Sequence, residues 1–154
     1  LASFTERGMI EKLTSQEIND RDPKQLNSSF LAFKELISRF PESRYAKDSA
    51  LRMTYLVNAL AAHELHVARY YMKRGAYLAA ANRCKYVLEN YPHATGMEEA
   101  LVILISAYDS LEFNDLKEDT MRVLKTNYPD SKMLLKGVPK DQGDWWKFWE
   151  SLYQ

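Results

Sequence analysis

The sequence holds few side chains whose types and spacing could support catalysis or metal binding. His63 and His66 stand three residues apart in the stretch HELH, so both can lie on one face of a helix. The zinc-protease motif needs two histidines four residues apart, and no third ligand accompanies this pair. Neither a glycine-rich phosphate loop nor a nucleophile elbow is present. We therefore predict no catalytic residue, no metal and no cofactor; a metal-dependent activity at the histidine pair is the enzymatic alternative.

The stretch KRGAYLAAANR carries two arginines, Arg74 and Arg83, that could bind a partner protein. In the helix expected after the Arg-Gly turn, Ala76, Ala79 and Arg83 are spaced i, i+3 and i+7 on one face. Alanines let a partner backbone come close, and an arginine beside them can form two hydrogen bonds with a carboxylate. The predicted partner-binding residues are Arg74, Ala79, Asn82, Arg83 and Tyr86. The alternative is that both arginines are solvated side chains on an outer face.

Length and charge limit the classes of protein to which this chain can belong. The 154 residues fit one domain with a sizeable core. The 21 basic residues balance 21 acidic ones, so the basic excess of a nucleic-acid-binding protein is missing and we predict no nucleic-acid partner. No run of about 18 apolar residues is present, so we expect no membrane-spanning helix. The chain has neither an initial Met nor a signal-peptide pattern, and we interpret it as a fragment whose targeting segment is missing.

Three aromatic-proline pairs divide the chain into helical units. The residue before a proline is pushed out of the α region, so Pro41, Pro92 and Pro129 each mark the end of a helix. The unit before Pro92 matches a tetratricopeptide (TPR) repeat, in which small residues let two antiparallel helices approach and a glycine permits the turn between them. Its matching residues are Ala68, Tyr71, Gly75, Tyr77, Ala80 and Pro92. The next unit fits the same register with Leu101, Leu104, Tyr108, Leu124 and Pro129.

These units predict an all-α fold, a TPR-type solenoid of helical hairpins that occupies residues 1–154 as a single domain. Upstream, we expect a helix that is capped by Asp22, begins at Pro23 and carries one apolar stripe. The stripe consists of Phe30, Phe33, Leu36, Ile37 and Phe40. Residues 45–74 contain no strong helix breaker, so they form one long helix or two helices that meet near LAAHE. Cys84 falls on an apolar stripe and is predicted to be a core residue.

The chain ends in an aromatic segment, which we predict to be a helix over residues 145–153 after an irregular stretch over 130–144. All three tryptophans lie in it, at Trp145, Trp146 and Trp149. Its apolar residues recur at i, i+3, i+4 and i+7, as on one face of a helix, at Trp145, Phe148, Trp149 and Leu152. Such a helix could cap the last apolar groove of the solenoid. A partner-binding or membrane-surface role is the alternative.

A second binding mode of TPR proteins is a carboxylate clamp, in which concave basic residues and asparagines hold the C-terminus of a peptide. The corresponding positions of the first unit are partly basic, with Arg69 and Lys73, whereas those of the next unit are mainly apolar. The positions are Leu65, His66, Arg69, Met72 and Lys73, followed by Val102, Ile103, Ser106 and Asp109. Their composition argues against a clamp, and a generic peptide-binding co-chaperone is the alternative function.

The stretches DRDP, RFPESRYAKDSA, VARYYMKRGAYLAAANR and NYP, in this order, resemble the BamD family of outer-membrane assembly lipoproteins. The resemblance runs from about Phe4 to Trp149, and the third stretch carries most of its specificity. Members of that family have five TPR units behind a lipoprotein signal and a lipidated cysteine. The resemblance therefore implies that this chain is the C-terminal part, about units three to five.

The resemblance also implies a function, a non-enzymatic scaffold of the outer-membrane β-barrel assembly complex. It implies a place on the periplasmic face of the bacterial outer membrane, with membrane contact only through an N-terminal lipid anchor absent from this chain. The implied partners are the last POTRA domain of the barrel insertase BamA and other Bam lipoproteins. In the family, arginines at the turn and in the following helix lie at the BamA contact; these correspond to Arg74 and Arg83.

Overall fold

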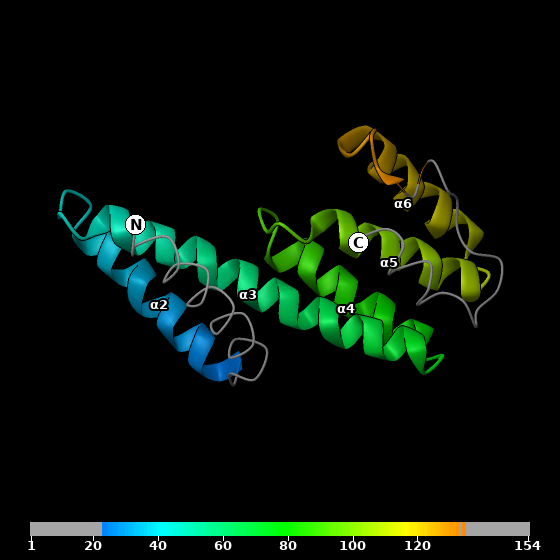
Figure 1. Ribbon diagram of the computed structural model, residues 1–154, viewed down its shortest axis with the longest axis horizontal. Coiled ribbons are helices and arrows are strands. Elements are labelled where there is room, and N and C mark those ends of the chain that lie inside the picture. Colours follow the sequence, from blue (N-terminus) through cyan, green and yellow to red (C-terminus); the bar gives the residue numbers. More distant parts are fainter. Residues whose placement is uncertain (1–22, 133, 135–154) are drawn as a thin grey trace, which may run out of the picture. The chain divides into compact units, whose positions relative to one another are not determined.

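The computed structural model describes residues 23–132 and 134, and every regular element among them is an α-helix (Figure 1). The helices are α2 (Pro23–Arg39), α3 (Ala46–Lys73), α4 (Tyr77–Asn90), α5 (Met97–Ser110) and α6 (Asn114–Asn127). The predicted all-α class is therefore confirmed. The chain divides into two compact units inside α3, between His63 and Glu64. A single solenoid over residues 1–154 stays a prediction.

Helices α2, α4 and α6 end where the aromatic-proline pairs predict. Their last residues, Arg39, Asn90 and Asn127, each lie two positions before a proline. Tyr91 and Tyr128 precede two of these prolines and have φ/ψ of −128/52° and −136/66°, outside the α region. The ring of the following proline disfavours helical backbone at these positions, so local sequence sets the helix ends.

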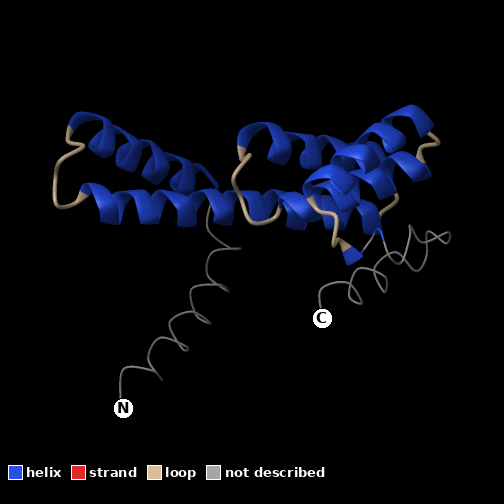
Figure 2. Ribbon diagram, turned by 90° about the horizontal axis from the view of Figure 1, so that it is seen from above, coloured by secondary structure: helices blue, strands red, loops and turns tan. Residues whose placement is uncertain are grey.

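In the first unit, α2 and the part of α3 up to His63 lie side by side as a hairpin (Figures 1 and 2). Its buried residues are Leu26, Ala46, Ser49, Leu56, Ala59, Leu60 and Ala61. Pro23 begins α2 as predicted, whereas Asp22 lies outside the described residues. Four members of the predicted α2 stripe are half-buried, but Phe40 is 61% exposed. Since α2 ends at Arg39, Phe40 leaves the helical face that the other four share, and this differs from the prediction.

Helix α3 runs without interruption for 28 residues, which decides between the two predicted arrangements in favour of one helix. Residues 46–73 contain neither Pro nor Gly, so nothing in the local sequence interrupts the hydrogen-bond ladder. No helix within the described residues 23–132 combines the length and the apolar character needed to cross a bilayer.

In the second unit, the last part of α3 packs with α4, α5 and α6 through residues that the TPR spacing predicts. Ala68 and Ala80 are fully buried, which lets the backbones of α3 and α4 approach closely. Cys84 is buried as well, so its prediction as a core residue is confirmed. Helix α5 is apolar on all sides, and residues 100–108 are buried without exception. The repeat spacing thus locates the core of this unit correctly.

The turn between α3 and α4 is a Schellman motif with Gly75 in the left-handed position. The N–H of Gly75 donates to the carbonyl of Met72 at 3.1 Å, and the N–H of Ala76 donates to the carbonyl of Tyr71 at 3.0 Å. Gly75 has φ of 71°, a conformation that glycine adopts without a Cβ clash. The same hydrogen-bond pattern ends α5, where Glu112 takes the left-handed position with φ of 59°. Both hairpins therefore close with one motif, although the second lacks glycine.

Helices α5 and α6 share a core cluster, and the chain after α6 returns to it. The cluster consists of Leu101, Val102, Ile105 and Leu124, and Leu134 packs against it. At the start of α5, a Cβ added to Gly96 would overlap Leu65, so the backbone passes very close to α3 here. The predicted aromatic helix over 145–153, most of the irregular stretch over 130–144 and residues 1–22 lie outside the described part of the chain.

Candidate partner-binding site

Arg74 follows the last residue of α3 and is exposed. Its guanidinium carbon lies 5.4 Å from the ring centroid of Tyr70, one helical turn earlier. An arginine over an aromatic face gains a cation–π attraction of about 0.5–1 kcal/mol at an exposed site. The ring therefore restrains the guanidinium while leaving its N–H groups available to a partner.

Arg83 reaches from α4 back to α3, where its Nη1 donates a hydrogen bond to Oε2 of Glu64 at 2.9 Å. The Arg83 side chain is 44% exposed and the Glu64 side chain 15% exposed. The hydrogen bond to Glu64 raises the pKa of Arg83, opposed by partial burial and assisted by Tyr71. Arg83 is therefore held by a carboxylate of its own chain rather than freely solvated on an outer face, and part of its surface remains open.

In the structure, the two arginines are linked by a series of neighbouring side chains on α3 and α4. Arg74 lies over Tyr70, and the rings of Tyr70 and Tyr71 meet edge to face with centroids 5.9 Å apart. Tyr71 in turn interacts with Arg83, which is bound to Glu64. We call Arg74, Tyr70, Tyr71, Arg83 and Glu64 the arginine–tyrosine cluster. The arrangement holds two permanent positive charges between aromatic rings and one acid.

The other predicted contact residues lie along α4 beside this cluster. Asn82 and Tyr86 are exposed, and Ala79 is half-buried. The Tyr86 ring packs edge to face on Tyr91, with centroids 5.8 Å apart. Burial and the hydrogen bond with Tyr86 raise the pKa of the Tyr91 hydroxyl, so Tyr91 stays neutral at physiological pH. Helix α4 therefore carries a half-buried small residue, an exposed amide and an exposed aromatic ring near Arg83, and their role in partner binding stays a prediction.

Comparison with known proteins assigns most of the chain to one family. Residues 6–132 match the family described as YfiO, outer membrane lipoprotein. The chain belongs to this family. It is 47% identical over 150 residues, or 97% of its length, to the outer membrane protein assembly factor BamD of Neisseria gonorrhoeae. Proteins of the same name from Xylella fastidiosa strain 9a5c and Vibrio cholerae are 36% and 34% identical, over 85% and 79% of the chain.

The chain spans about half the length of the curated relatives that it matches. It covers 56% of the Neisseria gonorrhoeae protein, 45% of the Xylella fastidiosa protein and 51% of the Vibrio cholerae protein. The family resemblance predicted from the quoted stretches is confirmed, and with it the TPR-type helical fold class.

Three members of the arginine–tyrosine cluster, Glu64, Tyr70 and Tyr71, were not predicted as site residues from the sequence of this YfiO-family chain. Glu64 lies 19 positions before Arg83, so no local spacing rule connects them. Tyr70 stands four residues before Arg74, a spacing at which helical side chains meet, and this regularity could have revealed the cation–π contact.

The histidine pair shows no sign of a metal centre in the YfiO-family chain. His63 is half-buried and His66 is exposed. Within the described residues, no group of three or more histidine, cysteine, aspartate or glutamate side chains could hold a metal ion. Burial raises the pKa of the Cys84 thiol, which keeps it protonated and unsuited to act as a nucleophile.

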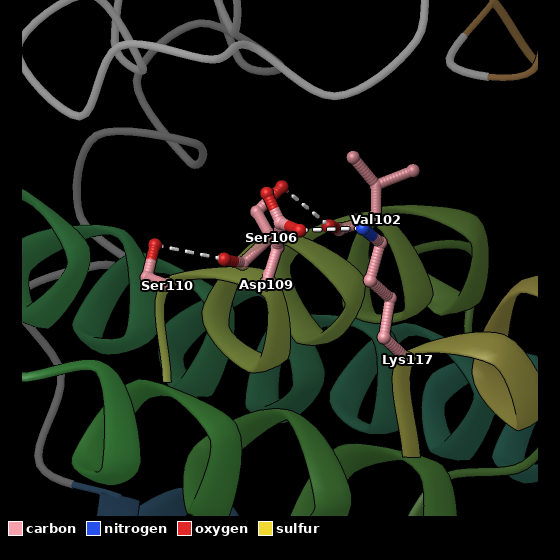
Figure 3. Close-up of polar contacts among 5 residues, drawn as sticks. All are labelled: Val102, Ser106, Asp109, Ser110 and Lys117. Carbon is pink, nitrogen blue, oxygen red and sulfur yellow. Dashed lines mark hydrogen bonds and ion pairs between the residues drawn. The ribbon is translucent and has the colours of Figure 1, made fainter. Parts of the chain in front are cut away.

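Most positions considered for a carboxylate clamp are buried or paired within the YfiO-family chain, whereas His66 and Lys73 are exposed. Arg69 forms an ion pair with Glu99 of α5, and Asp109 forms one with Lys117 of α6 (Figure 3). Three further positions, Val102, Ile103 and Ser106, are buried. Of the two basic side chains considered for a clamp, Arg69 is therefore engaged within the chain and Lys73 is exposed, which leaves one base where a clamp uses several.

Proposed function

We propose that this chain is part of a non-enzymatic scaffold for outer-membrane protein assembly, at the periplasmic face of the bacterial outer membrane. Relatives that cover most of the chain carry the name outer membrane protein assembly factor BamD, which supports this role. The family description, outer membrane lipoprotein, supports the location. Membrane attachment of the whole protein would then be the task of a lipid anchor, and the helical units would bind other proteins.

The partner that we propose for the arginine–tyrosine cluster is the last POTRA domain of BamA, with other Bam lipoproteins as further members of the complex. The observation that carries this proposal is the joint placement of Arg74 and Arg83. Both guanidinium groups are oriented by neighbours on α3, so little side-chain entropy is lost when a partner binds. A planar guanidinium suits a carboxylate of the partner, and Ala79 lets the partner backbone come close.

Reversing the charge of Arg83 tests this proposal. Arg83→Glu should abolish co-purification with BamA, because a partner carboxylate would then meet a like charge. Lys85→Glu is the matched control, since it makes the same charge change at an exposed position of the same helix. Far-UV circular dichroism of both variants should match that of the unaltered protein. Equal co-purification of BamA with both variants would overturn the proposed site.

A second variant separates binding from internal packing. Glu64→Gln removes the acid that holds Arg83 within the chain but leaves the guanidinium in place. If Arg83 binds BamA directly, Glu64→Gln should retain BamA with at most a modest loss, because the amide oxygen of the new side chain can still accept a hydrogen bond that orients the guanidinium. If Arg83 only holds α4 against α3, Glu64→Gln should lose BamA to the same extent as Arg83→Glu, and the direct contact would be refuted.

A further inference from the structure

Tyr71 occupies a position that recurs in the next helical hairpin. The aromatic-proline pairs that follow α4 and α6 stand 37 residues apart, and the same offset relates Tyr71 of α3 to Tyr108 of α5. The structure confirms this register, because Gly75 and Glu112, also 37 residues apart, take the left-handed position after α3 and after α5. An aromatic ring at this position therefore belongs to the packing of either hairpin.

The surroundings of the two tyrosines differ. The other members of the arginine–tyrosine cluster have uncharged counterparts 37 residues further on: Glu64, Tyr70, Arg74 and Arg83 correspond to Leu101, Ala107, Leu111 and Thr120. Tyr108 packs instead on the ring of Phe113, with centroids 6.3 Å apart. Repeat packing thus accounts for an aromatic ring at both positions, but it does not account for the charges around Tyr71.

On one side, Tyr71 faces the side chain of Arg83. Glu64, Ala68 and Tyr71 are spaced i, i+4 and i+7 on α3, so they share one face of that helix. This face meets α4, since Ala68 is fully buried and Arg83 binds Glu64 at 2.9 Å. Helical side chains lean towards the N-terminus of their helix, so the Tyr71 ring extends towards the turn that carries Glu64. The Arg83 guanidinium donates a hydrogen bond to its hydroxyl oxygen.

On the other side, the ring of Tyr71 supports Tyr70 beneath Arg74. The two tyrosine rings meet edge to face with centroids 5.9 Å apart, and the Arg74 guanidinium carbon lies 5.4 Å from the Tyr70 centroid. Tyr70 is 52% exposed, so the contact with Tyr71 limits the rotamer freedom of an otherwise solvated ring. Tyr71 is half-buried and therefore contacts the neighbours that restrain both arginines from below the surface.

We propose that Tyr71 is a positioning residue for partner binding, which fixes Arg83 through its hydroxyl and Arg74 through its ring. This inference rests on the proposed function, since it concerns how the arginine–tyrosine cluster binds BamA. A side chain that is already ordered loses less entropy when the partner arrives. A guanidinium fork also binds a carboxylate well only in the correct orientation. The hydroxyl and the ring of Tyr71 thus make two separable contributions, one for each arginine.

Tyr71→Phe tests the hydroxyl, because it retains the ring and the backbone of the turn. The dissociation constant of the complex between the full chain and whole BamA should rise about fivefold, the effect of one lost hydrogen bond. In an Arg83→Gln background, the same substitution should change the dissociation constant by less than about twofold, because the guanidinium that it orients is gone. Tyr108→Phe is the matched control, since it removes a hydroxyl at the equivalent position of the next hairpin, and it should leave binding unchanged.

Tyr71→Leu tests the ring. Arg74→Gln should weaken BamA binding by the same factor in the unaltered protein and in Tyr71→Phe, which keeps the ring. The factor should be smaller in Tyr71→Leu, because Tyr70 has lost its support there. Urea denaturation checks that each variant is folded, and Tyr71→Phe carries the test by itself if Tyr71→Leu does not fold.

Dependence on the background separates positioning from a general effect on the fold. A fold defect in Tyr71→Phe would weaken binding equally with and without Arg83→Gln, and that result would overturn the proposal. Unchanged binding in Tyr71→Phe, together with weaker binding in Arg83→Gln, would also overturn it while leaving the proposed contact with BamA in place. Unchanged binding in both Arg74→Gln and Arg83→Gln would instead refute the proposed contact, and this inference with it.

Discussion

Replacing Arg69 with methionine should destabilise the second unit by about 2–3 kcal/mol at neutral pH. Arg69 of α3 forms an ion pair with Glu99 of α5, and the two side chains are 29% and 17% exposed. Removing one partner of a fully buried pair costs about 3–5 kcal/mol, because the remaining charge is left without compensation. The residual exposure of both side chains lowers this cost. Methionine retains the apolar stem of the arginine, so the loss reports mainly on the charge.

The pH dependence of this loss follows from the pKa of Glu99. Burial raises that pKa above its ordinary value of 4.5, and Arg69 opposes the rise. A raised pKa means that Glu99 stabilises the fold most below pH 4.5, and that this contribution is lost as pH rises through the raised value. Without Arg69 the pKa should rise further. The destabilisation caused by Arg69→Met should therefore be smallest near pH 4.5 and grow towards neutral pH.

Urea denaturation followed by circular dichroism, between about pH 4.5 and 7.5, measures these differences. The matched control is Arg52→Met, which breaks an exposed pair with Asp48 whose side chains are 61% and 62% exposed. That variant should lose less than about 1 kcal/mol. The double variant Arg69→Met/Glu99→Leu should recover most of the stability, since no charge is left buried. Equal losses for Arg69→Met and Arg52→Met, or a loss that does not shrink in acid, would refute the reasoning.

The two Schellman turns and the tight packing of the second unit yield further predictions. Gly75→Ala should lower the free energy of unfolding by about 1 kcal/mol, and Glu112→Gly should raise it by a similar amount, since both positions have positive φ. Urea denaturation that shows Gly75→Ala to be stabilising or Glu112→Gly to be destabilising would contradict this. Gly96→Ala should lower the free energy of unfolding by about 1–3 kcal/mol, because its Cβ would overlap Leu65. Leu65→Ala should lower the free energy of unfolding less when it is added to Gly96→Ala than when it is made in the unaltered protein. Cys84 should resist an aromatic disulfide reagent at about pH 8.5 until urea unfolds the protein, because burial raises its pKa; rapid labelling of the folded chain would argue against the buried position.

Features governed by neighbouring residues were predictable from the sequence. The helix ends before the prolines follow from the steric effect of proline on the preceding residue. The turn at Gly75 and the close packing of Ala68 and Ala80 follow from residue size. These rules act over a few positions, and the structure confirms all of them. The buried Cys84 was predictable for the same reason, since it continues the helical spacing of the α4 core.

Features that depend on distant residues were not predictable. Glu64 and Arg83 are 19 positions apart, and Arg69 and Glu99 are 30 apart, so only the packing of the helices reveals which charges meet. The candidate site accordingly looked like two free arginines in the sequence. In the structure, Arg83 is bound to an acid of its own chain, and the two arginines are joined through a pair of tyrosines.

Site-specific photo-crosslinking within the assembled complex tests most directly whether α4 faces BamA. A photoreactive amino acid at Asn82 lies beside Arg83 on an exposed position, and one at Leu116 lies on α6 with 47% exposure as the control. We predict a crosslink from Asn82 to the last POTRA domain of BamA and none from Leu116. A crosslink to BamA from Leu116 with none from Asn82 would contradict the proposed contact.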